Sequence, residues 1–176
     1  MFAPEVEKLL NEQVVHEMYS AHLYLSMSAW LREKNLDGYA HWFYVQYKEE
    51  MDHALIFYNF ILNGGGNVSL GAIQAPPEEF DSLADVLQKS LEHEQFVTSL
   101  IYKITETAHQ YKDYKTTQCM DWFIKEQVEE EDNASSHIGR LKNFGSDAMG
   151  LHTLDQEAGA RAYVQTPQLA LYETGA

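Results

Sequence analysis

The sequence predicts an all-α protein: a bundle of four long helices with one long crossover between the second and third helices and a short fifth helix. Three observations predict this fold. Apolar residues recur at helical spacing in four segments of roughly 25–30 residues each. A stretch rich in glycine and proline separates the second segment from the third. No segment alternates strongly with the two-residue period of a β-strand.

The first two helices are expected to be joined by a short turn. The first runs from Pro4 to about Lys34, because apolar residues recur there every three or four positions and proline is favoured in a first helical turn. Residues 35–38 supply the turn. The second helix is expected from Tyr39 to Asn63, since the glycines at 64–66 end it.

The segment from Gly64 to Phe80 is expected to be a long connection. It contains four glycines and two adjacent prolines and shows no helical periodicity. A crossover of this size can run along a whole helix, whereas a tight turn would place the third helix antiparallel beside the second. The connection therefore decides the order in which the helices pack.

Two more long helices and a short one complete the expected fold. Asp81 or Ser82 caps a third helix that reaches about residue 109, and a fourth is expected over about 114–143. A weaker segment from about Thr153 to Tyr163 predicts a short fifth helix. The 176 residues allow one domain with a sizeable core, expected over residues 1–165, and residues 166–176 are expected to be a flexible tail.

The charge of the chain points to cationic partners. The sequence has 12 basic and 27 acidic residues and a net charge of −15, which argues against binding to nucleic acid or to an anionic membrane. An acidic surface that serves only solubility is the alternative on charge alone. The positions of the carboxylates must decide between the two.

The sequence also indicates a soluble, cytoplasmic protein. A single cysteine, Cys119, cannot form an internal disulfide, and the first residues lack the basic and apolar regions of a secretory signal. No uncharged apolar run approaches the roughly 20 residues that a transmembrane helix needs. We therefore expect no membrane association.

Each of the four expected long helices carries acidic or amide groups near its middle, on or beside the apolar face. For any one helix, a solvated polar face is the alternative explanation. Taken together, the groups from the four helices would meet at one depth of the bundle. Two divalent cations bound there would relieve the mutual repulsion of the carboxylates. Carboxylates with few imidazoles and no thiolate suit iron or manganese. The residues are Glu17, then Glu50 and His53 at helical i and i+3 positions, then Glu94, and finally Glu126, Gln127 and Glu130.

At these residues the sequence resembles the bacterial non-haem ferritins, a branch of the ferritin-like di-iron carboxylate family, over nearly the whole chain. The likeness lies in the order and spacing of several motifs. These are Leu10-Asn11-Glu12-Gln13, Glu17 with Tyr19 and Tyr24, Met27-Ser28-Ala29-Trp30, Glu49-Glu50-Met51 with His53, and Trp122 followed by Glu126-Gln127 and Glu129-Glu130.

The resemblance implies a ferritin-like bundle and a role for each matching residue. Glu17, Glu50 and His53 would hold a first iron, and Glu50 would bridge to a second iron held with Glu94 and Glu130. Gln127 would lie close to the two irons. Tyr24 would be a nearby hydrogen-bonding and redox-active residue, and Trp122 would be a secondary electron donor. A further iron site would be formed by Glu49, Glu126, Glu129 and Glu130.

The resemblance further implies iron storage and detoxification by a ferroxidase. Two Fe(II) ions per subunit would be oxidised to Fe(III) by O2 or H2O2, and ferric oxyhydroxide mineral would collect inside a homo-oligomeric shell of twenty-four subunits, with the fifth helix around the fourfold axes. The chain departs from animal ferritins at the positions that often form an acidic threefold channel, which here hold Thr116, Thr117 and Met120. The iron entry route is therefore open.

Three alternatives compete with this reading. A bacterioferritin would bind haem and would have a second Glu-x-x-His motif, yet Asn133 stands three residues after Glu130. Met51 falls at the haem-ligand position, but such a methionine more often packs in a core or an interface, so no haem is expected. A rubrerythrin-like oxidase or peroxidase would want the same second motif. A non-catalytic acidic scaffold would bind no metal.

Overall fold

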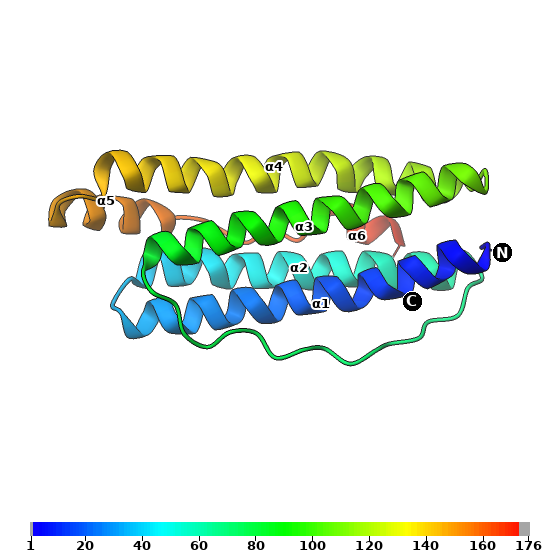
Figure 1. Cartoon of the computed structure of the whole chain (residues 1–176), viewed down its shortest axis with the longest axis horizontal. Coiled ribbons are helices and arrows are strands. Elements are labelled where there is room, and N and C mark those ends of the chain that lie inside the picture. Colours follow the sequence, from blue (N-terminus) through cyan, green and yellow to red (C-terminus); the bar gives the residue numbers. More distant parts are fainter. Residues whose placement is uncertain (1, 173–176) are drawn as a thin grey trace.

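The computed structural model describes residues 2–172, which form six helices and no strand (Figure 1). Four long helices lie side by side, and two short ones follow. The expected all-α four-helix bundle, with its long crossover and a short fifth helix, is confirmed. The helices are α1 (Pro4–Glu33), α2 (Asp37–Asn63), α3 (Leu83–Gln110), α4 (Tyr114–Phe144), α5 (Ala148–Ala158) and α6 (Pro167–Tyr172).

Local signals set the ends of the long helices. Pro4 stands in the first turn of α1, and Asn35 reverses the chain after α1 with a φ of 60°. Of the two expected caps of α3, Ser82 is the one used: its hydroxyl accepts a hydrogen bond from Asp85 N at 3.1 Å. Asp113 caps α4 by accepting from Thr116 N at 3.3 Å.

The crossover between α2 and α3 runs along the outside of α1 from one end of the bundle to the other (Figure 1). Asn11 fastens it near its start, because the side-chain oxygen accepts from Ser69 N at 2.6 Å and the amide donates to Asn67 O at 3.0 Å. Near its far end, Ser26 donates to Pro77 O at 2.6 Å. The long connection predicted from glycine and proline content therefore allows α3 to pack against α1.

The apolar core is divided into two clusters, one toward each end of the bundle. One contains Val14 and Phe123 and the other contains Tyr24 and Leu87. Between them lies a level at which buried polar side chains replace apolar ones. Because burying polar groups costs free energy unless they are paired, this level is where a functional site is expected.

The fifth helix begins five residues earlier than predicted, at Ala148 instead of about Thr153, and ends at Ala158 instead of about Tyr163. The cause is Asp147, whose side chain accepts from the backbone N–H groups of residues 149 and 150, both at 2.9 Å. Gly159 follows the last turn, so the helix stops there.

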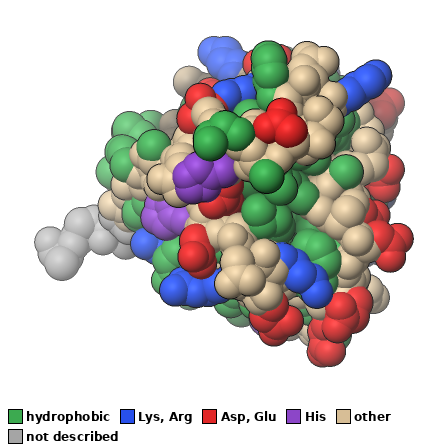
Figure 2. Space-filling view, turned by 90° about the vertical axis from the view of Figure 1, so that its left-hand side faces the viewer, with side chains coloured by type: hydrophobic (Ala, Val, Ile, Leu, Met, Phe, Trp, Pro, Cys, Tyr) green, Lys and Arg blue, Asp and Glu red, His purple; other side chains and the backbone are tan. Residues whose placement is uncertain are grey.

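Asp155 docks α5 onto the start of α2. Its two carboxylate oxygens accept from Gly38 N at 3.1 Å and from Tyr39 N at 2.9 Å. A Cβ atom at position 38 would lie 1.7 Å from Asp155 O, so only glycine permits this approach. Figure 2 shows this end of the molecule, with acidic side chains gathered along one side of it.

Residues 159–166 run back along the bundle to α6, which packs on α2 (Figure 1). Leu169 is fully buried in the first apolar cluster, and Asn63 Nδ2 donates to Tyr172 O at 2.8 Å. Six residues of the expected flexible tail thus form a helix, and residues 173–176 lie outside the described part. The division of the chain at residue 165 stays a prediction.

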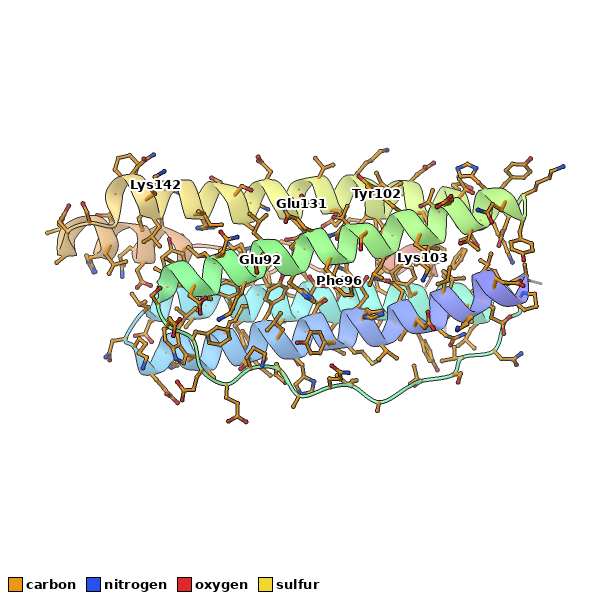
Figure 3. The ribbon with its side chains drawn as sticks, in the orientation of Figure 1. Glu92, Phe96, Tyr102, Lys103, Glu131 and Lys142 are labelled. Atoms are coloured by element: carbon orange, nitrogen blue, oxygen red, sulfur yellow. The ribbon has the colours of Figure 1, made fainter. Side chains whose placement is uncertain are left out.

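The outer face of α3 and α4 mixes charged and aromatic side chains. Glu92, Phe96, Tyr102 and Lys103 are exposed there (Figure 3).

Within residues 2–172, no helix combines the length and the apolar character needed to cross a membrane.

Candidate metal centre

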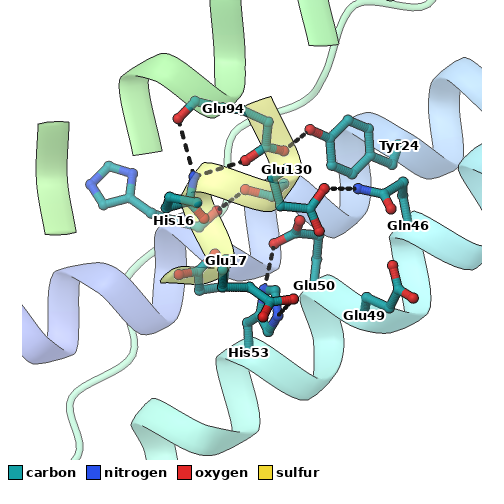
Figure 4. A network of polar contacts seen from close by, with 12 residues as sticks. His16, Glu17, Tyr24, Gln46, Glu49, Glu50, His53, Glu94 and Glu130 are labelled. Carbon is teal, nitrogen blue, oxygen red and sulfur yellow. Dashed lines mark hydrogen bonds and ion pairs between the residues drawn. The ribbon is translucent and has the colours of Figure 1, made fainter. Parts of the chain in front are cut away.

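The polar level between the two apolar clusters brings together side chains from all four long helices (Figure 4). Each of these side chains is at most 4% exposed, so together they form an interior site. They are Glu17 from α1, Glu50 and His53 from α2, Glu94 from α3, and Gln127 and Glu130 from α4. The convergence predicted from the sequence is therefore present in the fold.

Glu17, Glu50 and His53 form the tightest part of this site. Each offers one ligand atom, and the three atoms lie within 4.8 Å of one another. His53 Nδ1 lies 3.4 Å from Glu50 Oε2, as the i and i+3 spacing on one helix requires. Two carboxylates and an imidazole at this separation are a suitable ligand set for a divalent transition-metal ion.

One carboxylate oxygen of this group lacks a protein partner. Gln13 Nε2 donates to Glu17 Oε1 at 2.9 Å, one helical turn away, while Glu17 Oε2 is buried without a hydrogen bond. Leaving a buried acceptor unpaired costs about 1–3 kcal/mol. A cation bound between the three side chains would remove that cost.

Glu94 and Glu130 form the other half of the site and are held by neutral donors. The Tyr24 hydroxyl donates to one carboxylate oxygen of Glu94, and Gln127 Nε2 donates to the other at 3.0 Å. Gln46 Nε2 donates to Glu130 Oε2 at 2.8 Å. Neither carboxylate belongs to the group of Glu17, Glu50 and His53, whose ligand atoms lie within 4.8 Å of one another.

Crowding and burial change how readily the carboxyl groups lose their protons. Burial, followed by the charge of Glu50, raises the pKa of Glu17 to about 8. Burial, followed by the charges of Glu94 and Glu130, raises the pKa of Glu50 well above its ordinary value. Burial and the charge of Glu130 raise the pKa of Glu94 to about 8. Several carboxylates this close favour either protons or cations as their counterpart.

Tyr24 contacts the site as a neutral donor. Burial raises the pKa of its hydroxyl well above the ordinary value, and the charge of Glu94 adds to the effect. The ring packs 6.0 Å from the ring of His93, measured between centroids. Trp122 lies on the other side, its ring centroid 5.6 Å from that of His53.

The residues expected to form a further iron site are only partly brought together. Glu126 Oε1 lies 4.0 Å from His53 Nε2, at the edge of the buried group. Glu49 is half-buried on α2 and accepts from Arg161 Nη2 at 2.5 Å. Glu129 is exposed, because it is turned away from Glu130 on the surface of α4.

Sequence analysis assigned no role in the site to three residues that shape it. Gln13 and Gln46 are each 1% exposed and lie on the bundle-facing side of their helices. Their signal was an amide one turn before Glu17 and one turn before Glu50. Arg161 gave no signal, since 112 residues separate it from Glu49.

The chain is similar to known proteins of one family. The family pattern described as a Ferritin-like domain matches residues 7–144. The "Bacterial non-heme ferritin" of Staphylococcus aureus (strain USA300) is 37% identical over 163 residues, which cover 93% of this chain and 98% of the relative. The protein of the same name from Campylobacter jejuni is 40% identical over 156 residues, which cover 89% and 93%.

Solved structures show the same likeness. A novel open pore ferritin from the archaeon Archaeoglobus fulgidus superimposes with a TM-score of 0.91 at 37% identity, covering 92% of this chain and all of that one. A closed form of the same ferritin, made by site-directed mutagenesis, gives a TM-score of 0.91 and covers 93% of this chain. The expected resemblance is confirmed, and the chain belongs to the ferritin family.

Proposed function

We propose that this protein stores and detoxifies iron, and that the buried site inside its helix bundle is a ferroxidase centre. The observation that carries the proposal is the buried group Glu17, Glu50 and His53, with Glu94 and Glu130 facing it from the other two helices. Such a set of oxygen ligands with a single imidazole suits Fe(II) as substrate. Relatives that bear the name ferritin support the same assignment.

Each residue then has a distinct task. Glu17 and His53 would bind one Fe(II), Glu94 and Glu130 a second, and Glu50 would bridge the two. The carboxyl protons would leave as the cations enter, because the same oxygens cannot hold both. Each of the two Fe(II) would then give one electron, and the two electrons with two protons from solution would reduce O2 to H2O2, or H2O2 to two water molecules. Gln127 and Tyr24 would keep the oxygens of Glu94 oriented through their hydrogen bonds.

Glu49 and Glu126 would hold a further iron at the edge of the centre, next to His53. Glu129 is proposed as a contributor that reaches this position only by changing rotamer, since the side chain is exposed. Trp122, packed beside His53, would be a secondary donor of one electron to the same oxidant and would itself be left oxidised by one electron. No haem is part of the proposal.

Product Fe(III) would hydrolyse to ferric oxyhydroxide inside a hollow shell of twenty-four subunits in the cytoplasm. The docked α5 at one end of the bundle supports a role around the fourfold axes of such a shell. The shell would keep the mineral away from other cell components.

The proposal is tested by anaerobic Fe(II) titration followed by exposure to air. Wild-type protein should bind about two Fe(II) per subunit before oxidation and should retain further iron as mineral. Glu50→Ala should abolish fast oxidation while size-exclusion chromatography shows an unchanged assembly. Glu92→Ala, an exposed carboxylate on α3, is the matched control and should behave as wild type.

Two results would contradict the proposal. Equal oxidation rates in Glu50→Ala and wild type would remove the buried group from the chemistry. Catalytic reduction of H2O2 with an added electron donor, without any retained iron, would indicate a rubrerythrin-like peroxidase instead of a storage protein.

A further inference from the structure

The segment after α5 brings a positive charge to the edge of the metal centre. We call residues 159–166 the C-terminal strap; it runs back along α2 from the end of α5 (Figure 1). Arg161 lies near its start and is one of only three arginines in the sequence. Its guanidinium lies beside Glu49, the α2 residue that directly precedes Glu50 of the buried group.

The side chain of Arg161 is held there by two contacts of different kinds. Its Nη2 donates to Glu49 Oε2 at 2.5 Å, and its guanidinium lies 4.7 Å from the centre of the Trp42 ring. The side chains of Arg161 and Glu49 are each only 22% exposed, so water screens the pair less than it would at the surface. Arg161 Nη1 is buried without a partner.

Acidic residues of α2 also fix the rest of the strap. Asp52, one turn after Glu49, accepts from the Tyr163 hydroxyl at 2.9 Å and from Thr166 N at 3.3 Å. Lys48 Nζ lies 5.0 Å from the Tyr163 ring. The His41 side chain, also on α2, contacts the backbone oxygen of Arg161 through Nε2 at 2.8 Å. The strap is therefore attached to α2 through Glu49, His41 and Asp52, and only Glu49 belongs to the proposed iron positions.

We propose that Arg161 is a tethered counter-ion of Glu49 and occupies the position that the further cation would take. Binding of a divalent cation at Glu49 would displace the Arg161 side chain and loosen the start of the strap. This inference rests on the proposed function. A guanidinium and a divalent cation cannot share one carboxylate at contact distance without strong repulsion between them. The two occupants should therefore exclude each other.

The consequence is a site whose affinity depends on the strap. The two central positions have no tethered cation and should fill first. The further position should fill only when the cation outcompetes the Arg161 side chain, after which the strap remains attached through Asp52 and through the contact of His41 with the Arg161 backbone. Loading of the outer position would thus be coupled to the conformation of residues 159–162.

Calorimetric titration with Zn²⁺, which is redox-inert, tests the competition. Wild type should bind two Zn²⁺ ions per subunit tightly and a third weakly. Arg161→Gln should leave the first two unchanged and bind the third about tenfold more tightly, a change that corresponds to about 1.4 kcal/mol. Arg140→Gln is the matched control, because Arg140 makes its ion pair with Glu157 on α5 and not with Glu49.

Hydrogen exchange followed by mass spectrometry tests the displacement without relying on affinity. Amides of residues 160–162 should exchange faster in wild type at saturating Zn²⁺ than without it. Glu49→Gln should show the faster exchange with no metal added, because the ion pair is missing. Exchange at residues 163–166 should change less, since Asp52 still holds that part.

The outcomes separate this inference from the proposed function. If wild type bound no Zn²⁺ tightly, both would be overturned. If two ions bound tightly but the third had the same affinity in Arg161→Gln and wild type, only the role of Arg161 would be wrong. Unchanged exchange of residues 160–162 on Zn²⁺ saturation would also overturn it.

Discussion

The Tyr24 hydroxyl on α1 donates a hydrogen bond to Glu94 on α3, while Gln127 on α4 donates to the second oxygen of the same carboxylate at 3.0 Å. One buried carboxylate therefore joins three helices at the level of the candidate metal centre. Because both donors are neutral, they orient Glu94 without neutralising its charge, so the carboxylate still requires a proton or a cation as its counterpart.

Tyr24→Phe should slow iron oxidation several-fold without removing metal from the centre. The substitution keeps the buried ring but deletes one of the two donors that orient Glu94. Stopped-flow measurement of Fe(III) formation should show the lower rate, and anaerobic titration should still give about two Fe(II) per subunit. Tyr102→Phe, at an exposed tyrosine on α3, should leave both measurements unchanged. Loss of bound iron in Tyr24→Phe would show that the hydroxyl is needed for binding itself.

Glu17→Gln should make the metal-free protein more stable than wild type at high pH. The folded-state pKa of Glu17, about 8, exceeds its ordinary value of 4.5, so its contribution to stability is fully present below about pH 4.5 and is lost as pH rises through 8. The difference between variant and wild type should therefore grow from pH 5 to pH 8, by at most about 1.4 kcal/mol per pH unit. Thermal unfolding in the presence of a chelator measures it.

Added Zn²⁺ should reverse that order at pH 8, because a bound cation stabilises the folded state only where its ligands are intact. Glu92→Gln, at an exposed carboxylate on α3, should show no such pH dependence relative to wild type. A constant difference between Glu17→Gln and wild type across the pH range would contradict the raised pKa.

Gln127→Leu should weaken the second metal position and destabilise the metal-free fold. Gln127 Nε2 donates to the side chain and to the backbone oxygen of Glu94, at 3.0 and 3.2 Å, and loss of donors to a buried group costs about 1–3 kcal/mol. Anaerobic titration should show one of the two Fe(II) ions bound less tightly. Gln118→Leu, at an exposed glutamine on the same helix, is the control. Two equally tight ions in Gln127→Leu would refute its supporting role.

Much of the fold was predictable because its signals are local. The end of α2 at Asn63 follows from the glycines behind it, and the start of α1 at Pro4 follows from the preference of proline for a first turn. The predicted start of α5 was wrong because Gly150 lowers the helix propensity of the first turn, whereas Asp147 caps the helix just before it. A strong cap outweighed a weak pattern.

The site was predictable only where its partners share a helix. Glu50 and His53 could be paired from their spacing. By contrast, Gln46 donates to Glu130 across 84 residues, and nothing local indicates that pair. Glu129 was grouped with Glu130 by resemblance, yet neighbours in a helix point about 100° apart, and the structure exposes Glu129. The metal-binding roles of all these residues stay predictions.

Asp155→Ala should release α5 from the bundle. The carboxylate of Asp155 accepts from the backbone N–H groups of Gly38 and Tyr39, which otherwise have no partner at the start of α2. Loss of such a cap typically costs about 0.5–2 kcal/mol. The thermal midpoint should fall, and the amides of residues 38 and 39 should exchange faster. Asp132→Ala, at an exposed carboxylate on α4, should change neither quantity.

The same variant separates the docking of α5 from the chemistry of the centre. Asp155 contacts neither Glu17 nor Glu50, so Fe(II) binding per folded subunit should be unchanged, whereas the assembly should dissociate at higher protein concentration than wild type if α5 packs around a symmetry axis. Sedimentation velocity over a dilution series measures that dissociation. An Asp155→Ala assembly as resistant to dilution as wild type, with faster exchange at residues 38 and 39, would show that α5 serves only its own subunit.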